Sequence, residues 1–208
     1  MLKTERMDRV RAALRAQGLT QMIVCDPKSV WYLTGVAVEP YERLLALYLP
    51  TEGEPVLFLN RLFNVPEPPC RTVWHTDTDK PVAQIAEVVD AGRPLGIDKE
   101  WPAKFLIPLM ETHPGMQVVL SSDCVDDCRA CKDVEEQTLM REASRINDAV
   151  NEAAKHYIKA GMTEREVAEF IDAQFRAHGC EGPSFTTIVS FGANAADPVS
   201  YTHLTLPT

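Results

Sequence analysis

The sequence predicts an α/β protein whose first domain, residues 1–128, contains a mixed β-sheet covered by helices. Short apolar runs alternate with segments whose apolar residues recur at helical spacing, which is typical of such domains. Two of the apolar runs are joined by Pro-Thr-Glu-Gly-Glu, which is a hairpin signal. It predicts one antiparallel pair of strands within the alternation of strands and helices. Beyond residue 133 the spacing becomes that of long helices, so a second domain is predicted over residues 133–198.

The elements of the first domain follow from periodicity and from helix-start signals. Four helices are predicted, two from apolar residues at steps of three and four and two from a proline at the first helical position. They are Thr4–Gln17, Asp26–Gly35 with Asp26 as its cap, the segment from Pro81 that carries Val82, Ile85 and Val89, and the segment that carries Phe105, Leu106, Leu109 and Met110. The predicted strands are Met22–Cys25, Leu44–Leu49, Pro55–Leu59, Thr72–His75, Leu95–Ile97 and Gln117–Ser121.

Two capping boxes mark the helices of the second domain. Asp133 with Glu136 opens a long amphipathic helix that is predicted to end at Gly161. The second box opens another helix, which is predicted to stop at Gly179 and to turn Val167, Ile171 and Phe175 inward. The run Phe185–Phe191 is then predicted to be a strand.

Composition and charge exclude several classes of protein. Apolar residues make up 45% of the chain, which fits an ordinary globular protein and not a disordered one. The net charge of -9 argues against nucleic acid and against an anionic membrane as partners. The charged N-terminus lacks a signal sequence and no apolar stretch could span a membrane, so a cytoplasmic location is expected. The six cysteines are therefore expected to be free thiols.

Two polar motifs suggest a metal site, but each has a simpler interpretation. Cys124, Cys128 and Cys131 spell C-x3-C-x2-C, a spacing that can hold an iron–sulfur cluster or zinc, although one helix face could equally pack all three. The run His75-Thr-Asp-Thr-Asp79 alternates metal-ligand types, yet it also fits a turn that leads into the helix at Pro81. We expect packing for the first motif and a turn for the second. No catalytic residue is assigned.

Three stretches resemble the creatinase/prolidase/aminopeptidase P family, metallopeptidase family M24. They are Asp26–Gly35, Cys131–Ile146 and Gly182–Pro198, in the order and spacing of that family. The resemblance implies a three-layer creatinase-like N-terminal domain, followed by the beginning of an α+β pita-bread catalytic domain. It also implies an Xaa-Pro peptidase that acts on proline-containing peptides and forms a homodimer.

In this family two divalent ions, Mn, Co or Zn, activate water and polarise the scissile carbonyl. The resemblance implies that all five metal ligands lie downstream, so no metal ligand is assigned here and residues 1–208 are expected to be inactive. Phe185 matches an aromatic position of the substrate pocket in related prolidases, which makes it a candidate substrate-binding residue. A plain core position for the same side chain is the alternative.

The chain leaves the family pattern after Pro198. Residues Val199–Thr208 resemble translated adapter DNA, and the hypothesis is that this tail is non-native and that the chain is a fragment of a longer peptidase. Two alternatives to the peptidase stay open. One is a creatinase-like hydrolase of the same fold, and the other is a non-catalytic module for dimerisation or binding.

Overall fold

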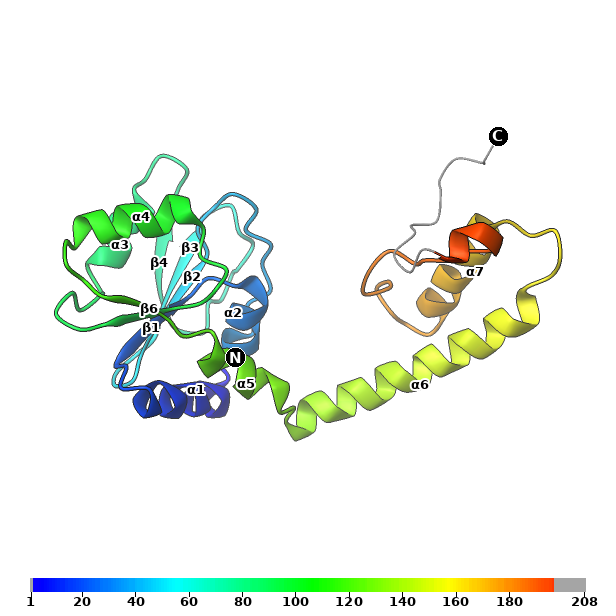
Figure 1. The fold of residues 1–208 in the computed structure, drawn as a ribbon, viewed down its shortest axis with the longest axis horizontal. Coiled ribbons are helices and arrows are strands. Elements are labelled where there is room, and N and C mark those ends of the chain that lie inside the picture. The colour runs from blue at the N-terminus through cyan, green and yellow to red at the C-terminus, as the bar shows by residue number, and fades with distance from the viewer. Residues whose placement is uncertain (1, 197–208) are drawn as a thin grey trace. The chain divides into compact units, whose positions relative to one another are not determined.

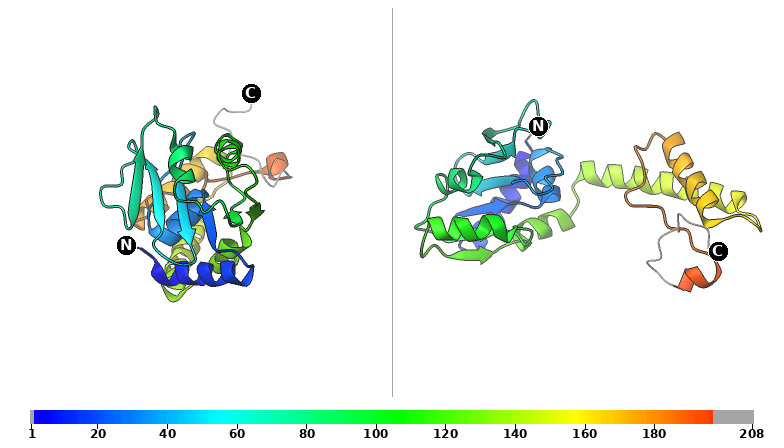
Figure 2. Two further views of the ribbon diagram at one scale, coloured as in Figure 1. Left: turned by 90° about the vertical axis from the view of Figure 1, so that its left-hand side faces the viewer. Right: turned by 90° about the horizontal axis from the view of Figure 1, so that it is seen from above.

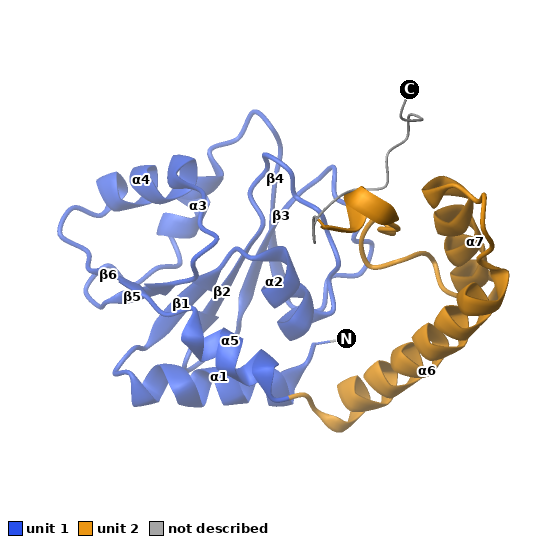
Figure 3. Ribbon diagram, turned by 45° about the vertical axis from the view of Figure 1, so that its right-hand side comes forward, with its two compact units in different colours: residues 1–131 blue, residues 132–208 orange. Residues whose placement is uncertain are grey.

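The structure is a computed structural model that describes residues 2–196. It divides into two compact units, residues 1–131 and residues 132–208 (Figure 3). The non-native tail predicted at Val199–Thr208 lies outside the described residues. Among the described residues, no helix combines the length and the apolar character needed to cross a membrane.

Unit 1, residues 1–131, is built on a mixed sheet. Within the described residues the sheet has six strands in the order β4-β3-β2-β1-β5-β6. Strand β2 runs antiparallel to both of its neighbours, and the other pairs are parallel. The predicted hairpin is therefore confirmed as β2–β3. The strands are β1 (Gln21–Val24), β2 (Ala46–Pro50), β3 (Val56–Asn60), β4 (Arg71–His75), β5 (Leu95–Ile97) and β6 (Val118–Leu120).

Helices cover both faces of this sheet, as Figures 1 and 2 show. Helices α1 (Thr4–Ala16), α2 (Pro27–Thr34) and α5 (Asp123–Ala130) share one core with the sheet. Helices α3 (Pro81–Ala86) and α4 (Ala103–Thr112) share the other. The predicted three-layer α/β fold with a mixed sheet is confirmed, and α5 is an element that the apolar spacing did not predict.

The alternation of side chains along each central strand explains the two cores. In β1, Met22 and Val24 enter the core beneath α1, α2 and α5, whereas Ile23 enters the core beneath α3 and α4. Since successive side chains of a strand point to opposite faces, a continuous apolar run is what a sheet covered on both sides requires. Strand β3 follows the same rule, with Leu57 on one face and Phe58 on the other.

The cap of α2 is the predicted one. The Asp26 carboxylate accepts from the backbone N–H of Lys28 and of Ser29, at 3.3 and 3.0 Å, and from the Ser29 hydroxyl at 2.6 Å. Arg129 of α5 adds an ion pair at 3.1 Å. Burial raises the pKa of Asp26, but the hydrogen bonds from Ser29 and Lys28 together with the Arg129 charge outweigh it and lower the pKa overall. At the other end Gly35 takes φ 76°, a left-handed cap that favours glycine.

We expect Asp26→Ala to lower the free energy of unfolding of unit 1 by about 1–2 kcal/mol at pH 7, since the cap and the ion pair are both lost. The folded pKa lies below the unfolded value, so this contribution is present above about pH 4 and fades as pH falls through the folded pKa. Urea unfolding can be followed by tryptophan fluorescence because Trp31, Trp74 and Trp101 all lie in unit 1.

Asp26→Asn is the matched variant for this prediction, because its carboxamide still caps α2 but carries no charge. It should lose less stability than Asp26→Ala at pH 7. A gap between wild type and Asp26→Ala that stays constant from pH 7 to pH 3 would contradict the assignment.

Unit 2, residues 132–208, contains two helices whose starts were predicted. Helix α6 (Val134–Tyr157) begins with the Asp133–Glu136 capping box, and α7 (Glu164–Ala177) with the Thr163–Glu166 box. The rings of Tyr157 and Phe170 stack at 3.8 Å where α6 meets α7. A small core of Val167, Ala168 and Val189, with Met162 and Ile171 beside it, holds α7 against the segment that follows.

Two predictions for unit 2 are wrong. Helix α6 ends at Tyr157 and not at Gly161, because Ile158 already adopts extended backbone. Residues 185–191 form no strand, although they were predicted to be one. A strand requires a partner, and among the described residues of unit 2 none offers an edge. The Phe191 N–H instead donates to the Glu164 carboxylate at 2.8 Å, and a short 3₁₀ helix, Gly192–Ala196, follows.

Candidate functional site

The candidate site lies at one edge of the sheet of unit 1. Strands β1, β3, β4 and β5 all end at this edge, whereas β2 begins there because it runs in the opposite direction. Ligands of open α/β sheets bind at the carboxyl ends of the strands, where loops diverge. The residues at this edge are Cys25 after β1, Leu44 before β2, Asn60 and His75 at the ends of β3 and β4, and Asp98 after β5.

Two adjoining pockets open at this edge. The first has a volume of about 200 Å³ and is lined by residues of the loop before β2, including Glu39 and Tyr41, and by Glu100. The second has a volume of about 270 Å³ and is lined mainly by polar residues of the loop before β2, of the last positions of β3 and β4, and of the turn after β4. Both are lined by Arg43, Leu44 and Phe105, so the two pockets are neighbours around these three side chains.

His75 forms the floor of the second pocket. It is 2% exposed, and its Nε2 atom lies 3.1 Å from the carbonyl oxygen of Leu44, to which it donates. Its Nδ1 atom lies 3.3 Å from Asn60 Nδ2 and accepts a hydrogen bond from it. Both ring nitrogens are therefore engaged, which leaves neither available to a metal. The histidine joins β2, β3 and β4 at the pocket.

The two aspartates that follow His75 serve different partners. Asp77 accepts two parallel bonds from Arg43, each 2.9 Å long, and one from Asn60, also 2.9 Å. The hydrogen bond from Arg43 lowers the pKa of Asp77. Asp79 instead closes the turn by accepting from the N–H and the hydroxyl of Thr76, at 2.6 and 2.7 Å. The turn predicted for this motif is confirmed. Within residues 2–196, no three histidine, cysteine or acidic side chains are grouped so as to hold a metal.

Tyr41 marks the loop over the first pocket as strained. Its φ of 50° is the one left-handed value at a non-glycine residue of the described chain, and its side chain is 79% exposed. A bulky residue in this conformation costs energy, and such strain is typical of loops that bind ligands. Beside it, Lys104 of α4 donates to the carbonyl oxygen of Glu42 and holds the loop against the helix.

Asp98 fixes the strand ends beneath the first pocket. One carboxylate oxygen accepts from the N–H groups of Cys25 and Asp26, at 2.6 and 2.8 Å, and the other from the N–H of Glu100 at 3.1 Å. Burial raises the pKa of Asp98, and these three hydrogen bonds offset part of that effect. Trp101 completes the link between the two strands by donating to the carbonyl oxygen of Ile23 at 3.2 Å.

The three cysteines of the C-x3-C-x2-C motif lie on or beside α5, away from both pockets. Cys124 is buried in the core, and burial raises its pKa to about 11. Cys128 is half-buried against the same core, so packing is confirmed for these two. Cys131 is exposed because α5 ends at Ala130, so a helix face shared by all three is wrong.

Phe185 belongs to unit 2, whereas both pockets belong to unit 1, and it is 72% exposed. A core position, the alternative for this residue, is therefore wrong, and its role in substrate binding stays a prediction. Sequence reasoning missed Arg43, Asn60, Phe105 and Tyr41. A signal existed for Tyr41 and Arg43 alone, the charged Glu-Pro-Tyr-Glu-Arg run immediately before an apolar strand.

Comparisons with known proteins place these features in a family. Residues 6–131 match the creatinase/prolidase N-terminal domain, and residues 138–205 match metallopeptidase family M24. An uncharacterized peptidase of Staphylococcus epidermidis is 26% identical over 91% of this chain and 54% of its own length. One from Staphylococcus aureus is 31% identical over 84% of this chain and 50% of its own length. The chain thus spans about half the length of the curated relatives it matches.

Solved structures resemble most of this chain. Dipeptidase PepE from Mycobacterium ulcerans superposes with a TM-score of 0.85 and 27% identity over 96% of this chain and 56% of its own. A dipeptidase from Pyrococcus horikoshii OT3 superposes with a TM-score of 0.80 and is 27% identical, over 95% of this chain and 56% of its own. The creatinase/prolidase N-terminal domain of an X-Pro dipeptidase from Streptococcus pyogenes shares the fold, with a TM-score of 0.51 and 22% identity, over 59% of this chain and 98% of its own. The chain therefore belongs to metallopeptidase family M24 and carries its creatinase/prolidase N-terminal domain.

Proposed function

We propose that this chain supplies the N-terminal part of a metal-dependent peptidase that hydrolyses the bond before proline, as aminopeptidase P and prolidase do. The observation that carries this proposal is the order of the two family matches, with the N-terminal domain over residues 6–131 followed directly by the metallopeptidase over residues 138–205. The named dipeptidases and prolidases among the solved relatives support a short peptide as the substrate. A creatinase-like reaction on the same fold is the alternative.

The metal centre of such an enzyme requires residues other than those described here. Family M24 is a family of metallopeptidases, and a pair of Mn, Co or Zn ions is the proposed cofactor. The side chains of residues 2–196 do not fit that pair, because they group no three metal ligands. We therefore expect residues 1–208 to lack hydrolytic activity on their own.

Phe185 is the proposed contribution of this chain to the substrate pocket. Its exposed ring is free to contact a ligand, and an aromatic face suits the flat, apolar ring of proline. Phe185 is followed by a segment that is anchored twice, by the Thr187 hydroxyl donating to Asp172 at 2.5 Å and by the Phe191 N–H donating to Glu164.

A chimaera tests the proposed reaction. Residues 1–191 would be joined to the aligned C-terminal half of the Mycobacterium ulcerans dipeptidase, which is the part this chain does not match. With Mn²⁺ present, the chimaera should release proline from an Ala-Pro dipeptide, whereas residues 1–208 alone should release none. Alanine release from Ala-Ala is the control for specificity.

Two results would overturn this proposal. Hydrolysis of Ala-Pro by residues 1–208 alone would show that the metal ligands lie within this chain. A folded chimaera that prefers Ala-Ala over Ala-Pro would refute the preference for proline.

The proposed setting is the cytoplasm, and the proposed assembly is a homodimer. All six cysteines fall within the described residues and are free thiols, which supports a reducing compartment. A role in binding without catalysis is the second candidate, and it is favoured by the strained, exposed Tyr41 above a formed pocket in unit 1. Size-exclusion chromatography with light scattering would measure the assembly directly.

A further inference from the structure

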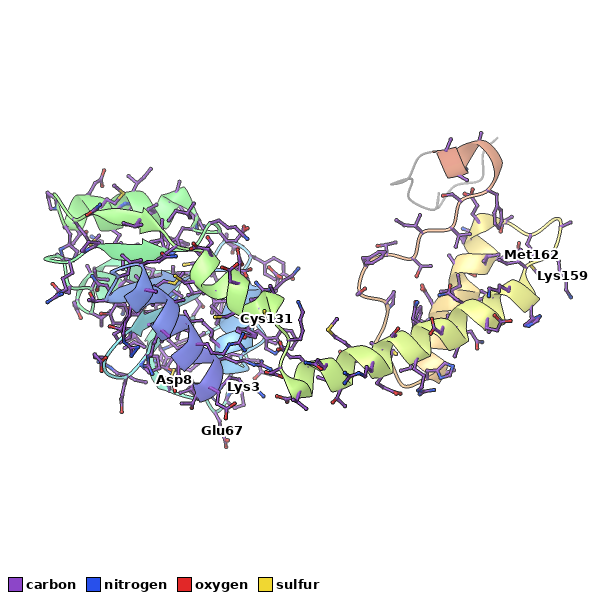
Figure 4. The ribbon with its side chains drawn as sticks, turned by 60° about the horizontal axis from the view of Figure 1, so that its bottom comes forward. Lys3, Asp8, Glu67, Cys131, Lys159 and Met162 are labelled. Carbon is purple, nitrogen blue, oxygen red and sulfur yellow. The ribbon has the colours of Figure 1, made fainter. Side chains whose placement is uncertain are left out.

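Two cysteines lie three residues apart where α5 ends. Cys128 occupies the last turn of the helix and is half-buried, whereas Cys131 follows the helix and is exposed. Figure 4 labels Cys131 at this end of α5. Residues three apart on a helix bring their Cβ atoms to about 5–6 Å. Although Cys131 stands just outside the helix, it lies near enough for its charge to raise the pKa of Cys128, and it is exposed to solvent.

One guanidinium group holds both residues in place. The same nitrogen of Arg9, Nη2, donates to the carbonyl oxygen of Cys128 at 2.5 Å and to that of Cys131 at 3.3 Å. The hydroxyl of Tyr32 donates to the Cys128 carbonyl as well, at 3.1 Å. These contacts come from α1 and α2, so the end of α5 is fixed to the body of unit 1 and the two backbones stay close together.

The backbone conformation of Cys131 permits its Cβ atom to move closer to that of Cys128. A disulfide needs Cβ atoms about 3.8 Å apart, so the pair must close by one to two ångströms relative to a regular helix. Cys131 has φ −94° and ψ 96°, outside the helical region, and therefore stands at the point where rotation does not unwind α5.

Cys124, the third cysteine of the motif, is a poor partner for either thiol. It is 1% exposed, so an oxidant in solution does not reach it. Burial also raises its pKa to about 11, which keeps it protonated at neutral pH, and the thiolate is the reactive form. Burial raises the pKa of Cys128 too, but there the positive charge and hydrogen bond of Arg9 oppose the shift.

We propose that Cys128 and Cys131 form a thiol–disulfide exchange site that reacts with small disulfides of the glutathione type. The exposed Cys131 thiolate attacks one sulfur of the small disulfide, whose S–S bond breaks and releases one thiol after protonation. The Cys128 thiolate then attacks the Cys131 sulfur of this mixed disulfide and releases the second thiol. Two protein thiols are oxidised to one disulfide, and one small disulfide is reduced to two thiols.

The guanidinium of Arg9 assists the second step, since it stabilises negative charge at Cys128 and keeps the two backbones adjacent. The disulfide would link Cys131 covalently to the last turn of α5, at the boundary between the two units. The site is independent of peptidase activity, so its test does not depend on the function proposed above.

The sequence offers a direct assay for this bond. Trypsin cleaves after Lys104, Arg129 and Lys132, so it places Cys131 in the tripeptide 130–132 and both Cys124 and Cys128 in the peptide 105–129. The reduced full-length chain would be incubated with oxidised glutathione, alkylated and digested. We expect the two peptides to remain joined and to separate only after reduction, with two fewer alkylated cysteines per chain.

Variants identify the partner within peptide 105–129. Cys124→Ser should still form the link, whereas Cys128→Ser and Cys131→Ser should not, and Arg9→Gln should form it several-fold more slowly. A link that persists in Cys128→Ser but disappears in Cys124→Ser would overturn the proposal. So would a stable glutathione adduct on Cys131 with no link, or the absence of any reaction.

Discussion

Replacing Asp98 by alanine should lower the free energy of unfolding of unit 1 by about 3 kcal/mol. Its two carboxylate oxygens accept from three backbone N–H groups, those of Cys25, Asp26 and Glu100. Asp98 is 4% exposed, so water does not readily replace the lost acceptor, and each buried donor left without a partner is costly. Urea unfolding followed by tryptophan fluorescence measures the change.

Two further variants define the cause of this loss. Asp98→Asn keeps one oxygen, which can still accept from Cys25 and Asp26, so an intermediate loss is expected. Asp127→Ala removes an exposed carboxylate from α5 and should stay within about 0.5 kcal/mol of wild type. A loss below about 1 kcal/mol for Asp98→Ala would mean that solvent enters and satisfies the three N–H groups.

The importance of Asp98 for the site follows from its position. It joins the end of β1 to the end of β5, and the residues it holds, Cys25 and Glu100, line the first pocket. The same carboxylate thus contributes to stability and to the shape of the pocket. A variant that unfolds more easily should for this reason also bind any ligand of that pocket more weakly.

The sequence predicted the elements of unit 1 well because their signals are local. Apolar runs such as Leu95–Ile97 were predicted to within a residue, and Asp26 followed by Pro27 was predicted correctly as the start of α2. Helix α5 was missed because Asp123–Ala130 is rich in acidic residues and carries only Cys124 and Val125 as fully buried side chains. So short an apolar stripe gives no periodicity.

The pocket residues could not be predicted from local patterns. Arg43 and Asp77 meet across 34 positions of the chain, and His75 bonds to Leu44 across 31. Such pairs depend on the order of the strands, which no spacing in the sequence reveals. The run Phe185–Phe191 shows the converse, because its composition favours a strand but strand formation depends on a partner segment.

Phe58→Ala should lower the free energy of unfolding of unit 1 by about 4 kcal/mol. Phe58 lies on β3 between Ala46 of β2 and Val73 of β4, and its side chain is fully buried beneath α3 and α4. Removing the ring deletes apolar contacts and leaves a cavity that rigid neighbouring strands do not fill. Phe58→Leu keeps most of the volume and should cost less than half as much.

Phe185→Ala provides the contrast within the same residue type. With its side chain 72% exposed, this substitution should change the stability of unit 2 by less than about 0.5 kcal/mol, measured by circular dichroism of α6 and α7. If the chimaera then releases proline more slowly with Phe185→Ala although its helices are intact, the loss reflects substrate binding and not folding. Unchanged proline release would remove Phe185 from the substrate pocket. A loss of helical signal would instead show that the exposed ring supports the fold of unit 2, which its burial does not predict.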